Sequence, residues 1–126
     1  PFRDGRCATW DVTVTDTVAV SYLNATSCSA GSAAEAAASQ KEKYAAISSN
    51  YLFLPLAFET FEPINQAGCD FLFVLGHSLS LVSDDPRESS FLFQRLSISI
   101  QRFNSVCFCN SFGNLPAQYF DQPRRT

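Results

Sequence analysis

The chain has 126 residues, of which 46% are hydrophobic, and it carries a formal net charge of −3. A chain of this length and apolar content is expected to form one domain with one core, and its composition is not that of a disordered protein. The negative charge has the wrong sign for a module that holds nucleic acid by itself through counterion release. Contact with DNA would therefore need another part of a longer protein to supply the affinity.

No stretch approaches the roughly eighteen consecutive apolar residues of a membrane span, and none has the layout of a signal peptide. The five cysteines are irregularly spaced, which is typical of neither a secreted disulfide framework nor a zinc site. We therefore expect an intracellular protein with free thiols and without membrane association.

The first predicted element is a β-hairpin. Asp4-Gly5 suits the two central positions of a type I′ turn, and apolar and polar residues alternate over 6–15 as in a half-buried strand. The strand that would precede this turn lies mostly before Pro1. We therefore interpret the chain as a fragment of a longer protein that starts within the hairpin.

A loop and a helix are predicted next. Residues 24–31, "NATSCSAG", are small and polar, which favours a loop. Ser32 and Glu35 have the spacing of a capping box, in which each side chain bonds the backbone N–H of the other residue. This pattern predicts a helix from Ser32 to about Ile47.

One buried strand and two further helices complete the predicted fold. Residues 51–58, "YLFLPLAF", form a continuous apolar run that predicts a strand covered on both faces, and Pro55 favours an edge or a bulge. Periodicity predicts a helix over 63–82, and "DDPRE" opens another over 85–104.

These elements predict a single α/β domain over residues 1–112, followed by an irregular tail over 113–126. Its sheet is small and mixed, made of the N-terminal hairpin and the one buried strand, and three helices flank it.

The candidate chemistry rests on a set of carboxylates and lysines. Asp11 lies on the second strand of the hairpin, Lys41 and Lys43 on the first helix, and Glu59 at the end of the buried strand. Clustered carboxylates bind Mg²⁺ through oxygen, and a lysine stabilises charge on an attacked phosphate, which together suit phosphodiester hydrolysis. The alternative is that Asp11 is an ordinary solvent-facing acid of a half-buried strand.

Cationic side chains also occur on the last predicted helix, where Arg95 and Arg102 share a stripe with apolar residues. With Lys41 they are candidates for nucleic-acid contact; the alternative is that both arginines extend along the edge of the core. His77, the single histidine, falls on a polar helix face and is predicted to be a surface residue rather than a general base.

Four segments, "GRCATWDVTVTDT", "KYAAIS", "LFLPLAFET" and "DDPRESSFLFQRLSISIQRFNSVCF", carry a family resemblance. Together they resemble the C-terminal parts of polyproteins from non-long-terminal-repeat retrotransposons, over nearly the whole chain to about Phe112. In those elements the region after the reverse transcriptase resembles a restriction-like endonuclease of the PD-(D/E)XK superfamily. The resemblance implies a truncated version of that fold.

By position, the resemblance implies that Asp11 is the second catalytic acid and a metal ligand, and that Lys43 before Tyr44 is the helical lysine. Glu59 is implied as an additional catalytic and metal-binding acid. Thr13 stands where the superfamily usually has lysine. The implied activity is Mg²⁺-dependent nicking of target DNA for reverse transcription, in the nucleus when the target is chromosomal.

The first acid of the superfamily's pair has no counterpart in this chain, because Asp4 is in the turn and too close in sequence to Asp11. We therefore predict that the chain is inactive as it stands. The alternative hypothesis is a non-catalytic structural or interaction domain that packs against the reverse transcriptase domain of the same polyprotein. Twelve phenylalanines, more than one small core readily hides, favour such an interface.

Overall fold

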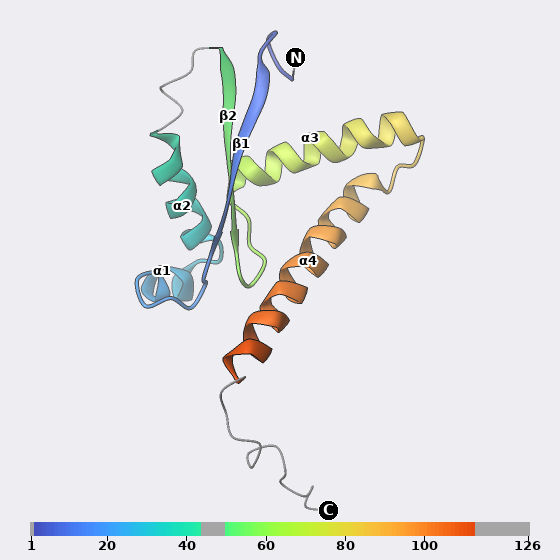
Figure 1. Cartoon of the computed structure of the whole chain (residues 1–126). Coiled ribbons are helices and arrows are strands. Elements are labelled where there is room, and N and C mark those ends of the chain that lie inside the picture. The colour runs from blue at the N-terminus through green and yellow to red at the C-terminus, as the bar shows by residue number, and fades with distance from the viewer. Residues whose placement is uncertain (1, 44–49, 113–126) are drawn as a thin grey trace, which may run out of the picture.

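The computed structural model describes residues 2–43 and 50–112. Two strands form a narrow sheet, with α2 on one face and with α3 and α4 on the other (Figure 1). This arrangement confirms the predicted α/β class. In chain order the elements are β1 (Cys7–Thr15), α1 (Leu23–Cys28), α2 (Ser32–Glu42), β2 (Tyr51–Glu59), α3 (Gln66–Ser83) and α4 (Glu88–Ser111).

The sheet differs from the predicted mixed sheet. β1 and β2 pair in parallel, with Cys7 opposite Tyr51 and Thr15 opposite Glu59. The Asp-Gly turn is confirmed, since Asp4 and Gly5 have φ values of 52° and 73°. In the described part of the chain, however, this turn closes only an isolated antiparallel bridge between Arg3 and Arg6. A turn motif specifies the reversal of the chain but not how far the pairing continues beyond it.

The outer edge of β2 is covered by the segment that follows it. The backbone of residues 60–65 turns back along the strand, so that Glu59 N donates to Pro63 O at 2.8 Å and Asn65 N donates to Ala57 O at 3.0 Å. The buried Asn65 side chain adds two bonds to the same edge, accepting from Ala57 N and donating to Pro55 O. The carbonyl of Pro55 thereby has a hydrogen-bond donor.

Side chains alternate between the two faces of the sheet and build two separate cores. On the α2 face, Ala57 packs against the small side chains of α2. On the opposite face, Leu56 and Phe58 pack against Phe71 and Leu72 of α3. The partly buried apolar residues of α4 extend this second core: Leu92, Phe93, Leu96 and Ile100.

The predicted loop and capping box near α1 and α2 are both wrong. Residues 24–31 include most of the short helix α1, and Thr26 Oγ1 donates to Thr17 O at 2.8 Å, which holds α1 against the preceding turn. At the start of α2 the N-cap is Gly31, with a φ of 87°, and Ser32 Oγ donates to Ser29 O instead of receiving a helix N–H. The first amides of α2 donate instead to Glu59, which is distant in the sequence, so local patterns do not encode this cap.

The later helices were predicted correctly in type, with shifted ends. α3 begins at Gln66 rather than near Pro63, because the intervening residues pair with β2. α4 begins at Glu88 and continues beyond Asn104 to Ser111. The predicted end of the first long helix, near Ile47, lies outside the described residues. No helix in the described ranges is long and apolar enough to cross a membrane.

Candidate functional site

Asp11 forms an ion pair with a lysine of α2, across the face of the sheet that this helix covers. The distance from Lys41 Nζ to Asp11 Oδ2 is 2.9 Å, and the two side chains are 40% and 43% exposed. An acid predicted on a strand and a lysine predicted on a helix are thus in contact. The lysine in contact is Lys41, which was predicted to contact nucleic acid, rather than Lys43, which the resemblance selected.

Glu59 has a structural role that accounts for its burial. Its carboxylate lies at the N-terminus of α2, where Oε1 accepts from Ala33 N at 3.0 Å and from Ala34 N at 3.2 Å. The residue is 0% exposed. A carboxylate at this position satisfies helix amides that have no partner within the helix and interacts favourably with the helix dipole. Oε2 of Glu59 is buried and has no partner among the described residues.

The structure does not bring the two predicted metal ligands together. Asp11 lies opposite Pro55, and Glu59 is four residues further along the same strand. At about 3.3 Å per residue, this separates the positions of the two acids by about 13 Å along the sheet. In the described part of the chain no three His, Cys, Asp or Glu side chains are grouped as a metal site requires. The arrangement does not fit the oxygen cluster that Mg²⁺ prefers.

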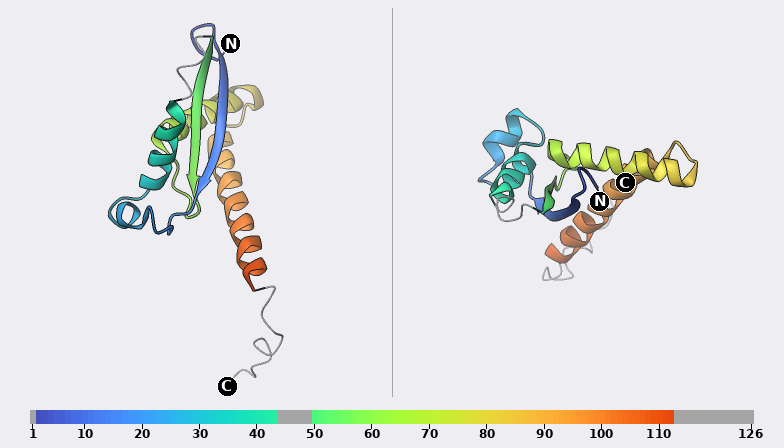
Figure 2. Two further views of the ribbon diagram at one scale, coloured as in Figure 1. Left: turned by 60° about the vertical axis from the view of Figure 1, so that its left-hand side comes forward. Right: turned by 90° about the horizontal axis from the view of Figure 1, so that it is seen from above.

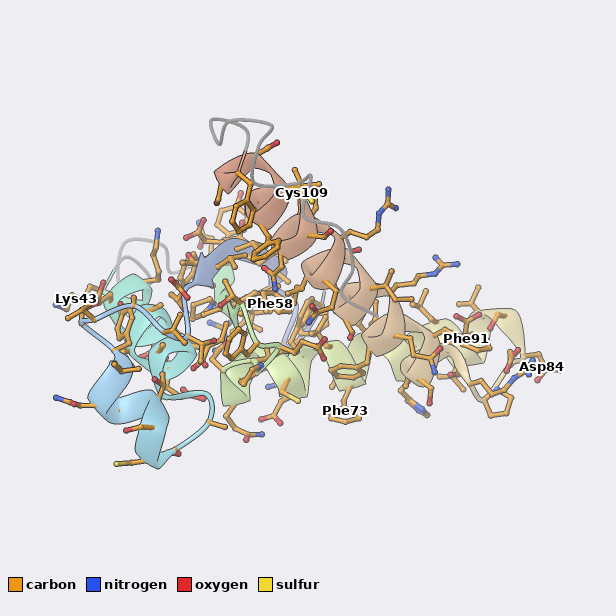
Figure 3. The ribbon with its side chains drawn as sticks, turned by 90° about the horizontal axis from the view of Figure 1, so that it is seen from below. Lys43, Phe58, Phe73, Asp84, Phe91 and Cys109 are labelled. Carbon is orange, nitrogen blue, oxygen red and sulfur yellow. The ribbon has the colours of Figure 1, made fainter. Side chains whose placement is uncertain are left out.

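The other predicted cationic residues lie apart from this ion pair. Lys43 is exposed beyond the last turn of α2, at the outer edge of the molecule (Figure 3). Arg95 and Arg102 are exposed on α4, which covers the opposite face of the sheet from α2. No single surface therefore presents Lys41 with both arginines. His77 is exposed on α3, as predicted.

An apolar groove between β1 and α4 is the main feature that the sequence prediction missed. It has a volume of about 360 Å³, and both strands and α4 contribute to its walls. We call it the β1–α4 groove and define it by its apolar residues, Val12, Val14, Phe58, Leu96, Ile100 and Phe103.

The side chains of β1 on this face are incompletely covered. Trp10, Val12 and Val14 are 57%, 55% and 59% exposed, although they point to the same side as the second core. On α4, Phe103 is 72% exposed. Exposed apolar surface of this extent and continuity is typical of an interaction site. The alternation in "WDVTVTD" predicted which residues share a face, but not that this face lacks a full cover.

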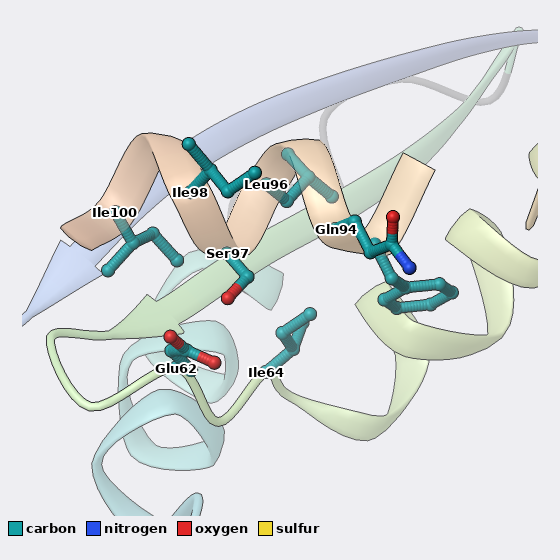
Figure 4. A pocket seen from close by; sticks show the side chains of 8 residues that line it. Glu62, Ile64, Gln94, Leu96, Ser97, Ile98 and Ile100 are labelled. Atoms are coloured by element: carbon teal, nitrogen blue, oxygen red, sulfur yellow. The ribbon is translucent and has the colours of Figure 1, made fainter. Parts of the chain in front are cut away.

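A second pocket of about 430 Å³ lies between α4 and the segment that links β2 to α3 (Figure 4). Its wall is mostly apolar, and Glu62 lies at its rim. Gln101 Nε2 donates to the Glu62 carboxylate at 2.8 Å. This hydrogen bond, with one from Ser97, holds the pKa of Glu62 below its usual value. The carboxylate therefore remains charged in neutral solution.

Comparison of this chain with protein-family models, with curated proteins and with solved structures finds no match.

Proposed function

We propose that this chain is a non-catalytic interaction domain that binds a protein segment in the β1–α4 groove. The observation that carries the proposal is the exposure of Val12, Val14 and Phe103 around one continuous apolar depression. Burying such side chains contributes roughly 1.5–3 kcal/mol each when they leave water completely. A partner that covers them would gain binding energy without rearrangement of the second core.

The two candidate metal-binding acids support this function indirectly, because both already make contacts within the fold. Glu59 stabilises the start of α2, and Asp11 is engaged by Lys41. The carboxylates on which the metal-dependent hypothesis depends therefore have partners that account for their positions. The reverse transcriptase partner that the resemblance implies stays a prediction.

Selection of binding peptides from a random library tests the proposal whatever the natural partner is. Peptides that bind the domain should lose at least about tenfold in affinity for Phe103→Gln, because the groove loses its most exposed aromatic wall. Leu81→Gln is the matched control, since Leu81 is 74% exposed at the far end of α3. Selected peptides that bind Phe103→Gln and the unmodified chain equally would contradict the proposal.

A DNA endonuclease is the second candidate function, favoured by the contact between a strand acid and a helical lysine. In a longer version of the chain that includes the missing first acid, it predicts Mg²⁺-dependent nicking of supercoiled plasmid. This nicking should be lost in Asp11→Asn and retained in Asp70→Asn, a control on the exposed surface of α3. The interaction domain predicts no nicking by any of the three proteins. The exposed ion pair contributes only about 0.2–1 kcal/mol, so Asp11→Asn should remain folded.

A further inference from the structure

One edge of the sheet is covered by another segment of the chain, and the other edge is largely open in the described residues. Residues 60–65 cover the outer edge of β2 with backbone and side-chain hydrogen bonds. β1 pairs with β2 on one side only, and the described residues place just the Arg3–Arg6 bridge on its other side. An uncovered strand edge is a template for pairing with another strand.

The hydrogen bonds at the ends of β1 show which residues face this open edge. Arg6 N donates to Arg3 O at 2.9 Å, on the open side, whereas Thr15 O accepts from Thr60 N at 2.9 Å, on the β2 side. Backbone groups of successive strand residues point to opposite edges. The N–H and C=O groups of Trp10, Val12 and Val14 therefore point to the open edge.

The open edge has few of the features that prevent strand addition. The segment from Ala8 to Thr15 contains no proline, glycine or lysine, and its one charged side chain, Asp11, already pairs with Lys41. α4 lies over the same face of the sheet as α3 (Figure 2). Its Phe103 lines the β1–α4 groove together with Val12 and Val14 of β1. A strand added to this edge would lie next to the exposed side chain of Phe103.

We infer that the occupant is a second copy of this chain, with the two β1 strands paired antiparallel about a two-fold axis through Val12. The inference rests on the proposed function, since it names the partner for the same groove. A two-fold interface must be complementary to itself. In this register Val12 faces its own copy, and Trp10 of each strand faces Val14 of the other.

The remaining side chains fit the same register. On the α2 face, Asp11 of one copy lies opposite Thr13 of the other. The two Asp11 carboxylates are diagonal to one another, and the Lys41 of each copy offsets their charge. At the ends of the paired region, Arg6 of one copy lies diagonal to Asp16 of the other, which brings opposite charges together. Trp10 of one copy lies opposite Val14 of the other. That Val14 lines the groove together with the exposed Phe103 of its own copy, so Trp10 comes near this phenylalanine. Opposite charges therefore lie close together at both ends of the paired region.

The available area indicates a weak dimer. Four apolar residues at this surface are more than half exposed: Trp10, Val12, Val14 and Phe103. Covering them in both copies buries on the order of 1,000 Å², which is at the lower limit for a specific interface. We therefore expect a dissociation constant in the micromolar range.

The on-axis position of Val12 gives a charge-complementation test by sedimentation velocity at about 1–500 μM protein. Val12→Glu and Val12→Lys should each weaken self-association by at least about tenfold, because each places two like charges opposite one another. An equimolar mixture of the two variants should recover the dimer, since only the mixed pair opposes Glu to Lys. Val20→Glu, at a 92% exposed position outside β1, should dimerise like the unmodified chain.

Three results would overturn the inference. An unmodified chain that stays monomeric over the whole range would exclude a second copy as the occupant. A dimer that persists in Val12→Glu would place the interface elsewhere, and failure of the mixture to recover would exclude the register about Val12. If the chain is monomeric but library peptides still bind in a Phe103-dependent manner, the groove binds a different strand. The proposed function would then survive without this inference.

Discussion

Removal of the Glu59 carboxylate is predicted to destabilise the fold strongly. The amides of Ala33 and Ala34 donate to Oε1, and both residues are 0% exposed, so water does not replace the lost acceptor in Glu59→Ala. A buried N–H left without a partner costs about 1–3 kcal/mol. Two such groups, partly offset by release of a buried charge, give an expected loss of about 3 kcal/mol in the free energy of unfolding.

Glu59→Gln is the matched control, because glutamine keeps the side-chain length and one oxygen acceptor. It should cost about 1 kcal/mol, the difference between a charged and a neutral acceptor at a helix N-terminus. Urea unfolding followed by the helical circular dichroism signal gives both values. The variants should be compared at the same pH and protein concentration.

A Glu59→Ala variant that is not less stable than the unmodified chain would refute this structural role of Glu59. If Glu59→Ala were as stable as the unmodified chain or more stable, the buried carboxylate would be a strained group retained for another purpose, such as metal binding. A rise in the thermal midpoint with Mg²⁺ in the unmodified chain, absent in Glu59→Ala, would support that assignment, because a ligand that binds only the folded state stabilises it.

Three further predictions concern the helices and the β2 edge. Hydrogen bonds from Arg87 lower the pKa of Asp85 to about 2, so its contribution should be complete above about pH 4 and lost as the pH falls towards 2; Asp85→Asn should remove this part of the pH dependence of the urea midpoint. Gly76→Ala should cost about 1–3 kcal/mol in urea unfolding, because the added Cβ would lie 2.7 Å from Ser89 Cα where α3 meets α4. Asn65→Ala should cost about 2–3 kcal/mol in the same assay, since the strand backbone loses a donor and an acceptor in a buried place.

The sequence predicted the types of most elements because their apolar patterns are long. The continuous run in β2 and the helical period of α3 and α4 do not depend on what lies around them. The ends of these elements do depend on it. α3 starts late because Asn65 bonds β2, and α2 begins without its capping box because a glutamate 26 residues away accepts its amides.

The candidate site was predictable only in part, for a similar reason. Alternation placed Asp11 and Val12 on opposite faces of one strand, which is a local property. Whether each face is covered depends on the path of α2 and α4, which no short pattern records. The acid therefore meets Lys41 where the resemblance selected Lys43, and the open groove appears only when the strands and α4 are placed together.

The residues on which the two functional hypotheses depend lie on opposite faces of β1, so the hypotheses can be tested separately. Asp11 points to the α2 face and to its ion pair, whereas its neighbour Val12 points to the β1–α4 groove. Asp11→Asn therefore alters the polar pair and leaves the groove intact, while Val12→Glu does the reverse. Each variant is a control for the other at nearly the same place in the chain. In a longer version that supplies the first acid, a loss of nicking only in Asp11→Asn would favour catalysis. A loss of self-association only in Val12→Glu would favour the interaction domain.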